Sequence, residues 1–201
     1  MDKSLDPRLN RLGLMTLDNL QQKEVLDQLP TFEVFVKSTT KRPIQHEGIV
    51  HAVNAEMAFV FAKEQFSRRN MCFGIWTVST DKIYITPFSD NAVSIYDQVS
   101  SKDIPAEGET FDIFHLMKRG KQHQYAGQVS ALNYEDAIYQ AKNLLKPEKP
   151  VLNIWVIKDT DIYKSTEEDL QIWQTLQEKT FRDATDYRGS DKIKEFKQQK
   201  G

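Results

Sequence analysis

The side chains best suited to metal binding or nucleophilic catalysis are few. They are four histidines and one cysteine: His46, His51, His115, His123 and Cys72. A carboxylate-bridged di-iron site needs Glu-x-x-His pairs on the helices of a bundle, and the sequence contains no such pair. The nearest spacing, Asp112-x-x-His115, lies in a segment that we predict to be a strand, where positions i and i+3 point to opposite faces. The sequence therefore predicts no metal site.

His46 and His51 also fall on opposite faces of one predicted strand, so they are not spaced to share a metal ion. All four histidines are therefore predicted to be surface or strand-edge residues. Cys72 with His51 as its base would be the pattern of a cysteine nucleophile. A single thiol forms no internal disulfide, four-cysteine zinc site or cysteine-ligated iron–sulfur cluster. The sequence also lacks a G-x-G-x-x-G motif, a P-loop and a G-x-S-x-G elbow. We therefore predict no catalytic residue and no cofactor.

The composition is typical of a soluble globular protein. Lys and Arg number 27 against 29 Asp and Glu, which leaves a net charge of −2. This balance opposes nucleic-acid binding, although Lys118, Arg119 and Lys121 form a small basic turn. Charged residues and Pro7 occupy the start, where a signal peptide needs an apolar run, and no apolar stretch is long enough for a membrane span. We expect a cytoplasmic protein.

The elements that would position these residues occur twice. At an offset of 79 residues, 32–84 aligns with 111–163 without a gap, with 15 identities in 53 positions, where ordinary composition gives roughly three by chance. The identities include Asn54 with Asn133 and Trp76 with Trp155. Because both copies have a tryptophan at this position, we expect these two side chains to pack in the third strand rather than to contact a ligand. Val151 stands opposite Cys72, which favours a strand-core role over catalysis for the cysteine.

Each copy has a ββαβ pattern. Two strands rich in aromatic and β-branched residues precede an asparagine N-cap, a helix and a third strand, and a short fourth strand follows. The helices are predicted at about 55–69 and 134–146. The fold class is α+β: two tandem ββαβ repeats form one pseudo-symmetric antiparallel-sheet domain, with an N-terminal arm and a C-terminal helix. Two loosely linked units are the alternative.

The predicted organisation has five parts. They are an N-terminal arm at 1–30, a first repeat at 31–87, a linker at 88–110, a second repeat at 111–164, and a C-terminal helix with a charged tail at 165–201. The leucine-rich arm is expected to dock on a partner or on this protein's own sheet. Ser165 and Glu168 have capping-box spacing, and Trp173 on the C-terminal helix indicates docking in cis or on another subunit.

Residues that occur in one copy alone can serve a function outside the shared fold. The first copy alone has His51, and its helix ends in Arg68, Arg69 and Asn70. The two arginines either complement the helix dipole or bind carboxylates of a partner protein. With Trp173, these residues are the candidates for a partner interface.

Four stretches of the first copy resemble one known family. They are FEVFVK from Phe32, HEGIVHA from His46, AEMAFVFAKEQFSRRN from Ala55 and IWTV from Ile75. They resemble the B subunit of phenylacetyl-CoA 1,2-epoxidase, the phenylacetic acid degradation protein B family. The opening SLDPRLNRL resembles longer members of the family that carry two copies.

The resemblance implies a non-catalytic, bridging subunit of a multicomponent monooxygenase in aerobic phenylacetate catabolism. The implied partners are a ferritin-like di-iron oxygenase subunit and its structural ferritin-like partner, with a flavin and iron–sulfur reductase as the source of electrons. For this chain it implies no metal and no cofactor, and the charge balance and hydropathy noted above predict no nucleic acid and no membrane. A homo-oligomer is left open, although the duplicated chain would do in one polypeptide what two short B subunits do as a dimer.

The competing hypothesis is a stand-alone α+β small-molecule-binding domain or enzyme that uses His51 or Cys72. It predicts a closed apolar pocket beside one of these two side chains.

Overall fold

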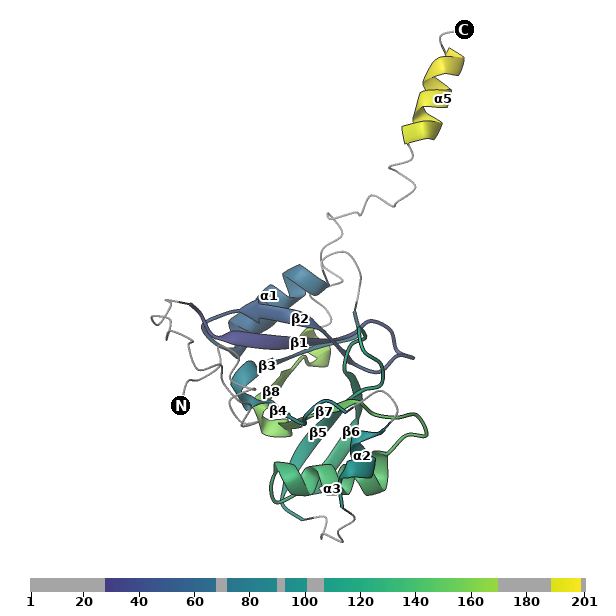
Figure 1. Ribbon diagram of the computed structural model, residues 1–201. Coiled ribbons are helices and arrows are strands. Elements are labelled where there is room, and N and C mark those ends of the chain that lie inside the picture. Colours follow the sequence, from purple (N-terminus) through teal and green to yellow (C-terminus); the bar gives the residue numbers. More distant parts are fainter. Residues whose placement is uncertain (1–27, 68–71, 90–92, 101–106, 170–188, 200–201) are drawn as a thin grey trace, which may run out of the picture. The chain divides into compact units, whose positions relative to one another are not determined.

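A computed structural model describes residues 28–67, 72–89, 93–100, 107–169 and 189–199. Two compact units divide the chain after Thr166. The first unit contains both repeats, and the second contains the C-terminal helix (Figure 1).

Both repeats have the predicted order of elements. The first consists of β1 (Thr31–Lys37), β2 (Gln45–His51), α1 (Ala55–Phe66), β3 (Gly74–Ser79), a 3₁₀ turn (Thr80–Lys82) and β4 (Tyr84–Ile85). The second consists of β5 (Glu109–Leu116), β6 (Gln124–Ala131), α3 (Tyr134–Leu145), β7 (Asn153–Lys158), a 3₁₀ turn (Asp159–Asp161) and β8 (Ile162–Lys164). The α+β class and the internal repeat are therefore confirmed.

The two long helices begin at the predicted asparagines. Asn54 Oδ1 accepts a hydrogen bond from the Met57 backbone N–H at 2.9 Å, and Asn133 Oδ1 accepts one from the Asp136 N–H at 2.8 Å. Each side chain thus pairs one of the unpaired donors of the first helical turn. Paired alanines on the sheet-facing side, Ala58 and Ala62 in α1, are fully buried and let the helix lie close to the strands.

The eight strands form one antiparallel sheet in the order β4-β7-β5-β6-β2-β1-β3-β8. The two repeats meet at the centre of this order, where Gln45 of β2 pairs with Gln124 of β6. Each repeat also lends its fourth strand to the other: β4 pairs with β7, and β8 pairs with β3. Because of this exchange, the two repeats form one sheet rather than two loosely linked units.

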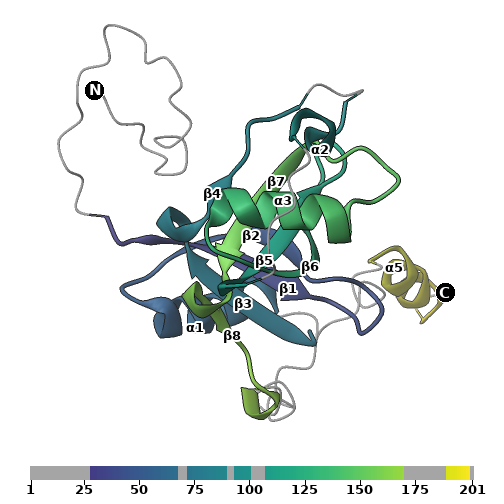
Figure 2. The ribbon, with the colours of Figure 1, turned by 90° about the horizontal axis from the view of Figure 1, so that it is seen from below.

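The inner faces of the two sheet halves pack against each other, while α1 and α3 lie on the outer faces (Figures 1 and 2). At the centre, the rings of Phe35 and Phe114, which are repeat equivalents, lie with centroids 4.4 Å apart. Each phenylalanine also packs edge-on against the tryptophan of the opposite repeat, Phe35 on Trp155 and Phe114 on Trp76. The packing role predicted for both tryptophans is confirmed.

A second core lies between α3 and the outer face of β5, β6 and β7, and it includes Phe111, Ile113 and Ala141. The short helix α2 (Ile95–Gln98) contributes Ile95 and Tyr96 to this core. The segment predicted as a polar linker therefore contains a helix that covers part of the second repeat.

Each second strand has a glycine where the helix crosses most closely. Gly48 and Gly127 have φ values of +154° and +149°, which side chains rarely adopt. A Cβ at Gly48 would lie 2.9 Å from the Phe66 ring, and a Cβ at Gly127 would lie 2.8 Å from Leu145. The glycines therefore allow the C-terminal end of each helix to rest on the sheet.

The C-terminal unit begins with helical residues at 167–169 and contains the helix α5 (Gly189–Gln199). The residues predicted as a charged tail are thus helical, and Ile193 and Phe196 are exposed. The Ser165 hydroxyl accepts a hydrogen bond from the Ile75 backbone N–H. None of the helices described here is long and apolar enough to cross a membrane.

Candidate functional site

His51 and Cys72, the components of the predicted nucleophile pair, lie at opposite ends of β1. His51 pairs with Thr31 at the start of β1, and its Nδ1 lies 3.3 Å from the Thr31 hydroxyl. Cys72 precedes Phe73, whose N–H donates to the Lys37 carbonyl at the end of β1. Seven strand residues span about 20 Å. In addition, burial raises the pKa of the Cys72 thiol, whereas an activated cysteine needs a lowered pKa.

His51 is the one interface candidate within the described residues. Arg68, Arg69, Asn70 and Trp173 lie outside the described residues. His51 is exposed, which suits an interface residue.

Two of the four histidines are buried, so the prediction of surface or strand-edge positions is wrong for them. Burial lowers the pKa of His115 to about 4, and its Nε2 lies 2.6 Å from the Tyr96 hydroxyl. His123 Nε2 lies 2.7 Å from Asn153 Oδ1. Each imidazole has a polar partner contributed by a distant segment, and this contact offsets the cost of burying the ring.

Asp112 and His115 lie on opposite faces of β5, as predicted. Asp112 is on the inner face, where Lys164 Nζ lies 3.0 Å from its Oδ2. Burial raises the pKa of Asp112, although Lys164 acts to lower it. Lys164 also pairs with Asp159 and lies over the Trp76 ring, 4.4 Å from its centroid. The ammonium group therefore links residues of both repeats.

Glu33 is the repeat equivalent of Asp112 and is also almost completely buried. His46 Nε2 lies 2.6 Å from its Oε2, and the Thr80 hydroxyl donates to its Oε1 at 3.2 Å. The two inner carboxylates are thus held by side chains from neighbouring strands and turns. In the described part of the chain, no three His, Cys, Asp or Glu side chains are grouped to hold a metal ion.

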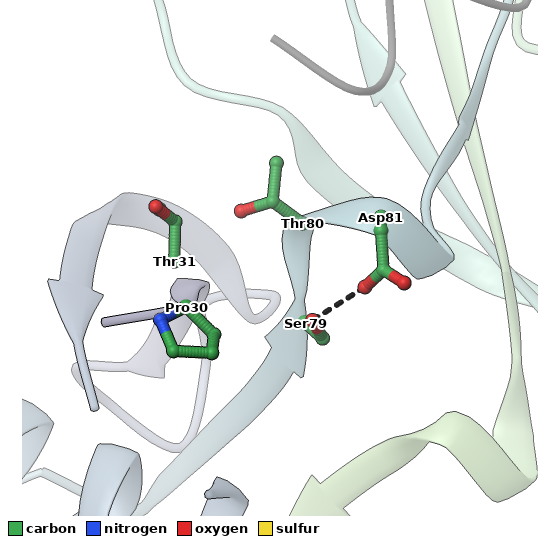
Figure 3. A pocket seen from close by; sticks show the side chains of 5 residues that line it. All are labelled: Pro30, Thr31, Ser79, Thr80 and Asp81. Carbon is green, nitrogen blue, oxygen red and sulfur yellow. Dashed lines mark hydrogen bonds between the residues drawn. The ribbon is translucent and has the colours of Figure 1, made fainter. Parts of the chain in front are cut away.

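A hollow of about 320 Å³ lies near the start of β1 and the turn after β3 (Figure 3). It is lined by Pro30, Thr31, Ser79, Thr80 and Asp81. Asp81 accepts a hydrogen bond from the Ser79 hydroxyl, and Thr80 bonds to the buried Glu33. Neither His51 nor Cys72 lines this hollow, and four of its five lining side chains are polar, which differs from the closed apolar pocket that the enzyme hypothesis predicts.

The most distinctive exposed feature is the outer face of α1. Met57, Val60 and Phe61 lie at i, i+3 and i+4 spacing and are 38%, 48% and 41% exposed, so they form one apolar stripe on the helix. We call these three residues the α1 stripe. Glu56 and Glu64 are exposed beside it.

The second repeat does not have this feature. Asp136, Tyr139 and Gln140 stand in α3 where the first repeat has Met57, Val60 and Phe61. The apolar stripe is therefore a property of one repeat and is not needed for the shared fold. The sequence analysis did not predict the α1 stripe, although an alignment of the two copies shows these three positions to be uniformly apolar in the first copy alone.

These features define a pseudo-symmetric α+β protein of two fused repeats with an apolar helix face on one of them. The chain belongs to the phenylacetic acid degradation B family, whose profile matches two adjacent segments, 28–104 and 107–194. Each match covers one repeat, which agrees with a duplicated form of the family, and the protein is thus a phenylacetate degradation protein. Comparisons with curated proteins and with solved structures gave no significant match.

Proposed function

We propose that this protein is a non-catalytic, bridging subunit of a multicomponent di-iron phenylacetyl-CoA epoxidase. In this role it binds a ferritin-like di-iron oxygenase subunit and its structural ferritin-like partner in the cytoplasm and carries no metal or cofactor of its own. Membership of the phenylacetic acid degradation B family supports the pathway.

The α1 stripe is the observation that carries the proposal. Exposed large apolar side chains grouped on one helix mark protein-binding surfaces. A ridge at i, i+3 and i+4 fits the groove between two helices of a partner, and the partners proposed here are helical bundles. The flanking Glu56 and Glu64 favour a groove with basic residues along its border.

The interface candidates from the sequence are part of the same proposal. Arg68, Arg69 and Asn70 follow Ser67, the residue that caps the C-terminal end of α1. We propose that the arginines pair with carboxylates of the partner, and that His51 and Trp173 add contacts.

Co-purification with the expected partners tests the proposed subunit role. The tagged protein is expressed with the ferritin-like products of its neighbouring genes, and the complex is analysed for mass and metal. We expect a stable complex with iron in the partner subunits. If the wild-type chain does not bind these partners, the proposed function is wrong.

The surface is tested by giving α1 the residues of α3. Met57→Asp with Phe61→Gln should weaken partner binding at least tenfold, since truncation of a central apolar contact commonly costs more than about 1.4 kcal/mol. The matched control is Leu144→Gln, because Leu144 is exposed on α3 and its repeat equivalent is Gln65. Wild-type binding by the α1 variant would show that another surface is used.

A further inference from the structure

The outer helices of the two repeats differ in exposure as well as in residue type. The three side chains of the α1 stripe are between 38% and 48% exposed. At the equivalent positions of α3, Asp136 and Tyr139 are half-buried and Gln140 is only 6% exposed. The same positions of the fold therefore present an exposed apolar surface in the first repeat and a largely covered, more polar surface in the second.

Helix α3 is also held along one flank by its own chain. The Lys142 ammonium donates to the Val99 carbonyl at 2.6 Å, and Lys146 Nζ lies 2.6 Å from Asp97 Oδ1. The short helix α2 and the residue that follows it thus lie beside α3. Tyr96 of α2 is fully buried in the outer core of the second repeat. Part of the α3 surface is therefore already used by an intramolecular contact.

The exposed residues of α3 do not form an apolar patch. Glu135 and Asn143 are polar, and Leu144 is the exposed large apolar side chain of this helix. A single exposed apolar residue is common on protein surfaces, whereas contiguous apolar residues mark binding sites. Protein interfaces also take most of their binding energy from a few residues clustered near the centre. Helix α1 offers such a cluster, and α3 does not.

The second repeat supports α1 from the side that faces the sheet. Its fourth strand, β8, pairs with β3, and Tyr163 of β8 packs on Phe59 of α1 with ring centroids 5.5 Å apart. Phe59 is buried and directly precedes Val60 of the α1 stripe. In the other half, Tyr84 of β4 is the equivalent of Tyr163 and stacks on Tyr134 of α3 at 5.3 Å. Each long helix thus rests on a tyrosine that the other repeat contributes.

We propose that the duplicated chain has one partner-binding face instead of two. Helix α1 binds the two ferritin-like subunits, which we call the partner pair, and the second repeat supports α1 without offering an equivalent face. Each chain then binds one copy of the partner pair, where two equivalent faces would bind two. The surface that fits α1 is a groove between two helices with basic residues along its border, since Glu56 and Glu64 flank the α1 stripe. This inference rests on the proposed function.

The ratio of chain to partner pair tests the inference directly. The full-length protein is mixed with an excess of the partner pair, and the mass of the complex is measured by native mass spectrometry. We expect one pair per chain. Two pairs per chain would overturn the inference and leave the proposed function intact, whereas the absence of any complex would overturn both.

Variants on the two helices locate the binding face. Met57→Asp with Phe61→Gln in α1 should weaken all binding of the partner pair at least about tenfold. Asn143→Lys with Leu144→Lys changes exposed residues of α3 and should leave both the ratio and the affinity unchanged. A site of wild-type affinity that remains in the α1 variant, or a site that is lost in the α3 variant, would overturn the inference.

The two contributed tyrosines test the supporting role of the second repeat. Tyr163→Ala should weaken binding of the partner pair about threefold or more, although this residue lies outside the first repeat, because it removes the ring on which Phe59 rests. The matched control is Tyr84→Ala, which removes the equivalent support of α3 and should bind like wild type. Urea unfolding shows that both variants are folded. Equal affinities of the two variants would overturn the supporting role.

Discussion

Individual polar side chains inside this protein are held by partners that differ between the two repeats. Glu33 and Asp112 occupy equivalent positions, yet Glu33 is bound by His46 and Thr80, and Asp112 is bound by Lys164. A buried charge or polar group needs such a partner, because its desolvation is costly. Carboxylates of this kind are common in active sites. Here their contacts are buried hydrogen bonds and an ion pair within the protein, which indicates a structural role.

His115 makes the stability of the protein depend on pH. Its ordinary pKa of 6.5 is lowered by burial to about 4, so between these pH values the unfolded chain binds a proton that the folded chain does not. Stability is therefore retained above pH 6.5 and decreases as the pH falls toward 4, by up to about 3 kcal/mol.

His115→Gln should flatten this dependence, because glutamine still offers Tyr96 a hydrogen-bond acceptor but does not titrate. Urea unfolding between pH 4 and 7 measures the effect, with stability of the variant falling less steeply than that of wild type. Parallel pH profiles would contradict the assignment of the buried neutral form to His115.

At the scale of elements, the exchanged fourth strands hold the two repeats together by equivalent contacts. After β4, the Thr86 hydroxyl accepts from the Ile154 N–H at 2.9 Å, and the Thr86 N–H donates to the Ile154 carbonyl. After β8, Ser165 makes the same two bonds to Ile75. Each repeat thus completes the third strand of the other.

Thr86→Val should destabilise the protein by about 1–3 kcal/mol, because it keeps the shape of the side chain but leaves the buried Ile154 N–H without its acceptor. Ser165→Ala should act in the same direction on Ile75. Urea unfolding measures both, with Ser79→Ala as the control, since the Ser79 hydroxyl bonds at an exposed site and its loss should cost less than about 0.5 kcal/mol. Equal stability of Thr86→Val and the control would disprove the role of these contacts.

At the scale of the whole first unit, we expect the inner core to make the two repeats unfold as one cooperative unit. Phe35, Phe114, Trp76 and Trp155 come from both repeats and touch across the centre. Neither half can lose this core without exposing the apolar face of the other. A covalent duplication with exchanged strands therefore behaves as one folding unit.

Phe35→Ala should test this cooperativity. Removal of a central ring costs about 3–5 kcal/mol, and the loss should reduce amide-exchange protection in β3 and β7 alike, although the substitution lies in β1. Hydrogen exchange followed by mass spectrometry measures both strands. Leu144→Gln, on the exposed side of α3, is the control. Protection lost in β3 but retained in β7 would show that the repeats unfold independently.

The sequence by itself determined the repeat, the order of the elements along the chain and the two asparagine caps. These features depend on near neighbours and on local periodicity, and the first copy also carried the stretches that resemble the family. The helix ends were predicted less exactly. Helix α1 ends at Phe66 and α3 at Leu145, whereas the predicted ends were at about 69 and 146.

Only the tertiary structure decided which distant residues meet. The exchange of β4 and β8, the pairing of His115 with Tyr96 and the burial of Asp112 beside Lys164 join segments far apart in the chain. No local pattern predicts them, because each depends on how both sheet halves pack. The same holds for the α1 stripe: its apolar residues were visible in the sequence, but their exposure became evident only when Ala58 and Ala62 were found on the sheet side of the helix.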